Sequence, residues 1–218
     1  GRLDGDLLAA GEEFAYYRRV AEHFGYESVD ETAKRIETAR CDPESNIDAP
    51  HTENELAANY YQCLLRRNHM RDFIDMIRMT VKGMSDEGDQ RLEPIPANYW
   101  LVDEFQDVDA LQYRLLNLHR VRMPAAIFTA VGDDDQSIYG WRGALGYQGM
   151  LNFERDFGAT RTMLTTNYRS YSEVVDGALR LIVGNAARYD KPMSAARGCG
   201  GTVHARSYDN SYDAAAAT

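Results

Sequence analysis

An adjacent pair of acids, Asp103 and Glu104, is the part of this sequence best suited to chemistry. The pair directly follows a short apolar run at residues 99–102, which predicts a buried strand. Ligands of open α/β sheets bind at the carboxyl ends of the strands. An Asp at such a place can hold Mg²⁺ beside a nucleoside triphosphate, and an adjacent Glu can orient or deprotonate an attacking water. Taken alone, the pair is more typical of a solvated strand end.

A second polar segment, residues 132–144, reads GDDDQSIYGWRGA. Its Gln136 lies three and five residues before Tyr139 and Trp141. Rings of this kind stack on nucleic-acid bases with a gain of about 1–3 kcal/mol and little sequence preference. Glycines and an arginine around the two rings favour a loop over a core position. The acids at 133–135 are also typical of a solvated turn, which is the preferred interpretation of Asp134 and Asp135.

Helices are predicted for the first 95 residues, because apolar side chains recur there at spacings of three and four. One helix is expected at residues 12–24 and another at residues 73–83. Between them, two helices are expected to begin at the capping boxes Ser28–Glu31 and Thr52–Glu55. Prolines and small polar residues make 41–50 a loop.

Beyond residue 96 the pattern predicts strands that alternate with helices, which implies a parallel α/β sheet. Strands are expected at 99–102, 124–131, 162–164 and 202–207. Helices are expected behind caps at Asp109–Gln112 and Ser170–Glu173, over 147–157, and from Asp213 to the last residue.

The charge of the chain is unevenly distributed. The net charge is −10, which by itself argues against a nonspecific nucleic-acid binder. Residues 136–206, however, carry nine basic and five acidic residues, a net charge of +4. The sequence shows neither a membrane span nor a signal peptide, and its three scattered cysteines suit neither a disulfide framework nor a zinc site. A cytoplasmic location is therefore expected.

Three segments, in this order along the chain, resemble motifs of a known protein family. Residues 103–107 resemble the Walker B element of superfamily 1 helicases, residues 132–144 resemble their third motif, and residues 164–170 resemble their fourth. The order and spacing are similar to those of the UvrD/Rep-type DNA helicases over about residues 53–213, and the helix with Asp72, Phe73 and Asp75 resembles that family's approach to the Walker B strand.

The resemblance implies roles for residues around a nucleotide. Asp103 would hold Mg²⁺, and Glu104 would be the catalytic base. Gln136 would contact the γ-phosphate of ATP, Tyr168 would lie against the adenine ring, and Arg169 would reach the γ-phosphate from the second motor domain. An arginine placed in this way contributes about 10³–10⁵ in rate to phosphoryl transfer.

The resemblance also implies a path for DNA. Tyr139 and Trp141 would stack on DNA bases. Arg142 would belong to the same DNA-binding loop and would tie this loop to its neighbours and to the strand end. A bland alternative exists for each: the rings could be core aromatics, and the acids and Arg169 could be solvated or paired at the surface.

The fold implied is a helical subdomain followed by an incomplete RecA-like parallel sheet with flanking helices, the P-loop NTPase fold. Residues 1–95 would be a helical insertion with lead-in helices, residues 96–160 the second half of the first RecA-like domain, and residues 161–218 the start of the second. The phosphate loop G-x-x-x-x-G-K-[ST] does not occur in the sequence. We therefore expect the chain to be an internal piece of a larger helicase, inactive as an ATPase by itself and with one face of its sheet uncovered.

The function implied is that of an ATP-dependent DNA helicase, moving 3′ to 5′ on single-stranded DNA and unwinding duplex DNA in repair, recombination or replication. Its partners would be DNA, ATP and proteins of such a complex, with no membrane. The alternative is an ATPase-inactive, helicase-like DNA-binding or scaffold module of a helicase–nuclease complex, which the intact Glu104, Gln136 and Arg169 disfavour. A Mg²⁺ nuclease is weaker still, because no second acid pair sits at a suitable spacing with a matching lysine.

Overall fold

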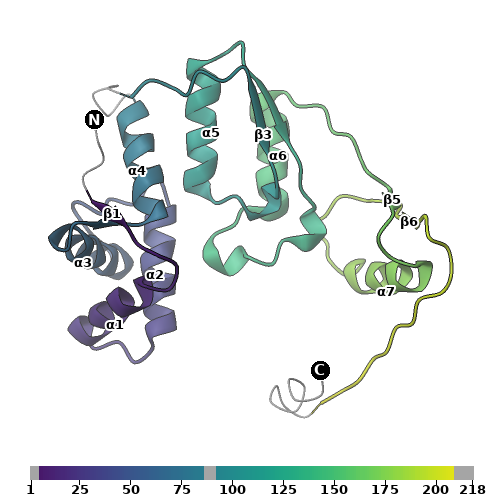
Figure 1. Cartoon of the computed structure of the whole chain (residues 1–218), viewed down its shortest axis with the longest axis horizontal. Coiled ribbons are helices and arrows are strands. Elements are labelled where there is room, and N and C mark those ends of the chain that lie inside the picture. Colours follow the sequence, from purple (N-terminus) through teal and green to yellow (C-terminus); the bar gives the residue numbers. More distant parts are fainter. Residues whose placement is uncertain (1–4, 86–91, 209–218) are drawn as a thin grey trace. The chain divides into compact units, whose positions relative to one another are not determined.

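Helices and short parallel strand pairs alternate along the chain in a mixed α/β arrangement (Figure 1). The computed structural model describes residues 5–85 and 92–208. The chain divides into two compact units, residues 1–159 and residues 160–218. The expected helix from Asp213 lies outside the described residues.

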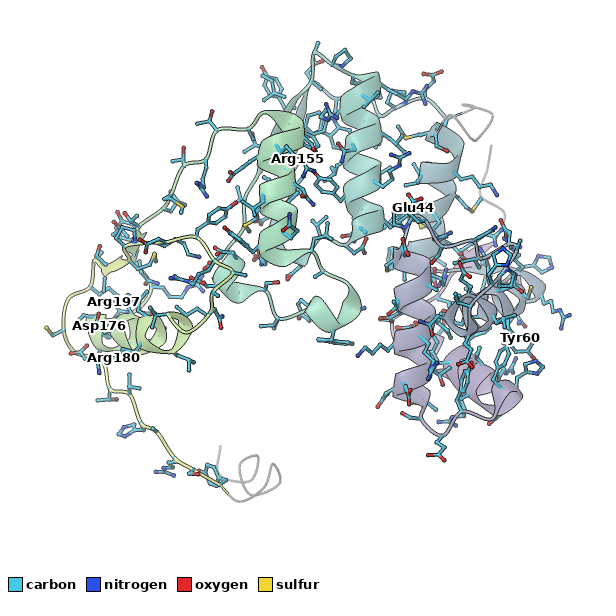
Figure 2. The ribbon with its side chains drawn as sticks, turned by 180° about the vertical axis from the view of Figure 1, so that it is seen from behind. Glu44, Tyr60, Arg155, Asp176, Arg180 and Arg197 are labelled. Atoms are coloured by element: carbon cyan, nitrogen blue, oxygen red, sulfur yellow. The ribbon has the colours of Figure 1, made fainter. Side chains whose placement is uncertain are left out.

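Three helices and one strand pair form the first part of unit 1. They are α1 (Glu13–Phe24), α2 (Val29–Cys41), α3 (Glu53–Arg67), and the parallel strands β1 (Asp6–Leu7) and β2 (Met70–Arg71). Their shared core contains the fully buried Val20, Ile36, Tyr61 and Leu65. Tyr60, labelled in Figure 2, lies on α3, and its ring stacks on His23 of α1 with the centroids 4.0 Å apart.

Local capping explains where these helices begin and end. Thr52 and Glu55 form the expected reciprocal capping box at the start of α3. At the start of α2, Ser28 accepts the Glu31 N–H, but the Glu31 carboxylate binds Arg35 at 2.9 Å instead of returning to Ser28. That capping box is therefore only half formed, because a guanidinium one helical turn away offers a charged partner.

A buried guanidinium joins three helices. Arg40 of α2 has an exposed fraction of 0% and binds Asp72, the N-cap of α4 (Phe73–Met84), and Asp75 of α4, the latter at 2.7 Å. The Tyr61 hydroxyl of α3 donates to Asp72 at 3.1 Å. Burial by itself would raise the pKa of Asp72, but the hydrogen bonds and charge of Arg40 outweigh it, so this pKa lies below its ordinary value.

The second part of unit 1 is a strand pair with two helices on one face. Strands β3 (Tyr99–Val102) and β4 (Ile127–Ala130) are parallel, and they pack against α5 (Ala110–Arg122) and α6 (Gly146–Phe157) (Figure 1). The Trp100 ring lies 4.4 Å from that of His119 on α5, and the Phe128 ring lies 5.1 Å from that of Phe157 on α6. Asp109 and Gln112 cap α5 as expected.

The other face of this strand pair is exposed. Leu101 is 82% exposed, and Tyr99 and Ile127 on the same face are exposed as well. The prediction of fully buried strands is therefore wrong for half of their side chains, because α5 and α6 cover only one side and no element of the described residues covers the other. The expectation of one uncovered apolar face agrees with this exposure.

Unit 2 contains α7 (Ser172–Ile182) and the parallel strands β5 (Thr166–Asn167) and β6 (Ser194–Ala195). The strands predicted at 162–164 and 202–207 are wrong, since both segments lack strand pairing. The predicted Ser170–Glu173 cap is also wrong, because the Glu173 carboxylate accepts backbone N–H groups of Gly200 and Gly201 instead. In Figure 2, Asp176 and Arg180 lie on α7, and the Arg197 guanidinium lies 4.1 Å from the ring centroid of Tyr171 at its N-cap.

Across the described ranges, the helices are too short or too polar for any of them to cross a membrane.

Replacing Arg40 by Met should lower the free energy of unfolding by about 3–5 kcal/mol, because Asp72 and Asp75 would stay buried without a compensating charge. The matched control is Arg35→Met, which removes two surface ion pairs and a contact with the Tyr26 ring and leaves no buried charge unpaired, so it should cost about 1 kcal/mol. Urea unfolding followed by circular dichroism measures both variants. Equal losses for the two would contradict this account of the helical core.

Candidate functional site

The acid pair stands at a sharp turn after β3. Glu104 has φ 49° and ψ 46°, a left-handed conformation that costs a non-glycine residue about 1–3 kcal/mol. A short 3₁₀ helix, η1 (Phe105–Asp107), follows at once, and its first residue is locked by a 2.9 Å bond from the Phe105 N–H to the Val131 carbonyl. The Phe105 ring is buried, so the turn leaves the carboxylates of Asp103 and Glu104 exposed at the carboxyl end of the strand.

A chain of hydrogen bonds joins this pair to the segment after β4. The Gln106 Nε2 donates to the Glu104 carboxylate at 2.7 Å, and the Gln106 Oε1 accepts the Asp133 N–H at 2.9 Å. The Asp133 carboxylate in turn accepts the Gln136 Nε2 at 2.7 Å. The structure therefore brings Glu104 and Gln136 to the same edge of the strand pair, linked through Gln106, whose exposed fraction is 2%.

Gly132 makes room for this link. A Cβ atom at residue 132 would lie 2.7 Å from the Gln106 Oε1 and 3.0 Å from the Phe105 backbone nitrogen. Both distances are far below van der Waals contact, so a larger residue would displace either the glutamine or the turn. Residue 132 must therefore be a glycine, because Gln106 and the backbone of Phe105 approach it too closely for a side chain.

The acids after Gly132 form a tight turn. The 3₁₀ helix η2 (Asp134–Gln136) follows Asp133, whose side chain accepts the Asp135 N–H at 3.2 Å. The three carboxylates of residues 133–135 lie within 4.8 Å of one another. Asp134 is buried, so its interpretation as a solvated side chain is wrong: the turn folds it inward.

The loop at residues 137–144, here called the aromatic loop because it carries Tyr139 and Trp141, is anchored to the helical part of unit 1. Trp141 lies in η3 (Gly140–Arg142) and is 57% exposed; Tyr139, just before it, is exposed too. The Arg142 guanidinium lies 5.5 Å from the Trp141 ring centroid, and its Nε lies 3.5 Å from the carboxylate of Glu37 on α2. Glu37 also accepts the Tyr17 hydroxyl at 3.2 Å. Arg142 thus stands between the ring and an acid that belongs to the helical core.

A second contact ties the same two parts together. The Cys41 thiol at the end of α2 lies near the carboxylate of Asp109, the N-cap of α5. Burial raises the pKa of the Cys41 thiol to about 12, with a further contribution from the nearby carboxylate, so the thiol stays protonated. Asp109 also forms a β-bridge with Ala144, the last residue of the 132–144 segment.

Tyr168 and Arg169 belong to unit 2. Both side chains are exposed, and the Asn167 Oδ1 accepts the N–H groups of Arg169 and Ser170 at 2.9 and 2.8 Å. This turn after β5 presents the two side chains at a strand end. Their approach to a nucleotide held by unit 1 stays a prediction.

Comparison with known proteins now adds to this geometry. Residues 7–158, which include the acid pair, the Gln106 link and the aromatic loop, match the family described as the UvrD/REP helicase N-terminal domain. The chain belongs to the UvrD/REP helicase family. The resemblance inferred from the three motifs is confirmed.

Several relatives of this UvrD/REP chain carry the name ATP-dependent DNA helicase PcrA. The protein of Leuconostoc citreum is 37% identical over 150 residues, which are 66% of this chain and 19% of the relative. Those of Staphylococcus aureus and Staphylococcus epidermidis are 37% identical over 147 and 146 residues, 66% of this chain and 20% of each relative. The chain matches about a fifth of the length of these relatives.

Sequence reasoning missed two residues of the site. Gln106 lies inside the Walker B string, and its position two residues after Glu104 was a signal that the turn could fold its amide back onto the carboxylate. Glu37 gave no local signal, because it is one acid among many on a helix far along the chain from Arg142.

Removing Glu37 should loosen Trp141. In a Trp100→Phe background Trp141 is the chain's one remaining tryptophan, and Glu37→Gln should lower its fluorescence anisotropy and raise its quenching by acrylamide. A half-exposed ion pair contributes only about 0.2–1 kcal/mol, so the free energy of unfolding should change by no more than that.

Glu44→Gln is the matched control for this experiment, because Glu44 is an exposed acid in the loop after α2 (Figure 2). It should leave the anisotropy of Trp141 unchanged. An identical response of the two variants would refute the anchoring of the loop by Glu37.

Proposed function

We propose that this chain forms part of the motor of an ATP-dependent DNA helicase of the UvrD/Rep type, which moves 3′ to 5′ on single-stranded DNA and unwinds duplex DNA. The observation that carries the proposal is the link from Glu104 through Gln106 and Asp133 to Gln136. It joins, within one unit, a candidate base to a candidate sensor of the γ-phosphate.

Asp103 would hold Mg²⁺. The exposed carboxylate at the carboxyl end of β3 suits a hard cation that prefers oxygen ligands and keeps several of its waters. When bound, the ion would neutralise charge on the phosphates of ATP. Asp103 already accepts the Glu104 N–H at 3.0 Å through one oxygen, which fixes the carboxylate toward the turn.

Glu104 and Gln136 would act on the attacking water and the γ-phosphate. The Glu104 carboxylate is held through one oxygen by Gln106, so its second oxygen can accept a proton from water. The Gln136 amide donates to Asp133, and the oxygens of a γ-phosphate would compete with that carboxylate for the same donor. Gain or loss of the γ-phosphate would then change what Asp133 binds.

The two units would be parts of two motor domains. In this proposal the β3–β4 pair with α5 and α6 is the second half of the first RecA-like domain, residues 1–95 are its helical insertion, and unit 2 begins the second domain. The division of the chain after residue 159 supports this assignment. Tyr168 would face the adenine ring, and Arg169 would supply positive charge to the γ-phosphate.

Tyr139 and Trp141 would stack on bases of single-stranded DNA. Their exposure on a loop beside η2 supports this role, as does the tolerance of aromatic stacking for any base. Arg142 would contribute by holding Trp141, since its guanidinium lies between the ring and Glu37. Repair, recombination or replication in the cytoplasm would be the process served.

Glu104→Gln in the complete helicase polypeptide that carries this segment should lower DNA-stimulated ATP hydrolysis by about 10²–10⁴, because a general base contributes that much. The KM for ATP and the affinity for single-stranded DNA should change little. Glu93→Gln removes an exposed acid that pairs only at the surface, so it serves as the control. The isolated 218-residue chain, without a phosphate loop, gives the background rate.

Full activity of Glu104→Gln would contradict the proposal. A wild-type protein that binds DNA but does not hydrolyse ATP would instead favour the scaffold alternative.

A further inference from the structure

We propose that Gln106 is a positioning residue: its buried amide holds the base Glu104 and the loop after β4 in one fixed relation, and Glu104 needs this support for its full rate of ATP hydrolysis. This inference rests on the proposed helicase function and deepens it. It assigns a task to a side chain that touches neither nucleotide nor DNA in that proposal.

The first argument is the chemistry of the side chain. At this place one group must donate to the Glu104 carboxylate and accept from the Asp133 N–H, at 2.7 and 2.9 Å. A primary amide does both at once, whereas a carboxylate only accepts and a hydrocarbon does neither. Asparagine has the same amide but is one methylene shorter.

The second argument is burial. Gln106 is 2% exposed although both of its partners lie near solvent, so water does not compete for its two bonds. The surrounding backbone fixes its position. The Phe105 N–H binds the Val131 carbonyl at 2.9 Å. The Gln106 Oε1 packs so closely against Gly132 that a Cβ atom at residue 132 would not fit. A side chain held this closely transmits a displacement of one partner to the other.

The third argument is where the bonds lead. Asp133 binds Gln136 at 2.7 Å, and the chain continues within a few residues to Tyr139 and Trp141. Gln106 therefore holds, through one amide, both the candidate base and the loop that carries the candidate γ-phosphate contact. The left-handed backbone of Glu104 makes its carboxylate sensitive to this support, because a strained turn keeps its geometry only while its neighbours hold it.

The test compares ATP hydrolysis by Gln106→Met and Gln106→Glu with wild type in the complete helicase. Methionine keeps the length of the side chain and loses both bonds, and glutamate keeps the acceptor alone. The kcat at saturating single-stranded DNA should fall about 10- to 100-fold in both, which is the effect of losing a buried hydrogen bond to a charged group. The KM for ATP and the DNA concentration for half-maximal activation should stay close to wild type.

The control is Gln148→Met, which makes the same chemical change on the exposed face of α6 and should leave kcat unchanged. A further variant separates positioning from loss of fold. Gly132→Ala keeps the glutamine at residue 106 but forces its Oε1 or the turn at Phe105 to move, so it should also lower kcat. Combined with Gln106→Met it should lower kcat by less than the product of the two single effects.

Three results would overturn the inference. One is a kcat for Gln106→Met equal to wild type, another is multiplicative effects of the Gly132 and Gln106 variants, and the third is a parallel loss of kcat, ATP affinity and melting temperature, which would show a purely structural role. If wild type itself showed no DNA-stimulated hydrolysis, the proposed function would fail and this inference with it, so the two failures are distinguishable.

Discussion

The side-chain amide of Gln106 is the interaction on which the arrangement of this site depends. It bridges the ends of two parallel strands that are joined by a helix and lie far apart in sequence, and it does so out of contact with water. One end of the bridge is the Glu104 carboxylate and the other is the Asp133 backbone N–H, so the bridge joins the turns that follow β3 and β4. The strained turn at Glu104, the glycine at residue 132 and the buried Phe105 ring all serve to keep this bridge closed.

A second constraint acts from the other side of the aromatic loop. Arg142 is paired with Glu37, and Ala144 forms a β-bridge with Asp109, so the loop is fastened to α2 at one point and to the start of α5 at another. The helix α2 is itself held rigid, because Arg40 is buried between two carboxylates. The helical region thus supports the loop that we propose to stack on DNA.

Features set by neighbouring residues could be predicted from the sequence. The capping pairs Thr52–Glu55 and Asp109–Gln112 form as expected, and the strand at 99–102 has the predicted bounds, because caps and apolar runs act over a few residues. Long-range partners could not be predicted in this way. The Glu31 carboxylate pairs with Arg35 instead of capping its helix. The Glu173 carboxylate accepts the N–H groups of Gly200 and Gly201, and Glu37 pairs with Arg142, far along the sequence. The strands of unit 2 are two residues long, which is too short for any periodic pattern to indicate them.

The motifs of unit 1 identify the acid pair, Gln136 and the two aromatic rings, and the structure places these residues on neighbouring turns. Motifs identify residues but not the contacts between them. Gln106 sits inside a motif, yet its two bonds follow from the left-handed turn at Glu104, which nothing in its residue type indicates.

The most direct test of this account is NMR of the Gln106 side-chain amide in the ¹⁵N-labelled 218-residue chain. If the amide bridges Glu104 and Asp133, its protons exchange with water much more slowly than those of the exposed Gln148, and Glu104→Ala removes most of the difference. Exchange of the Gln106 amide as fast as that of Gln148 in the unmodified chain would show that the bridge does not exist.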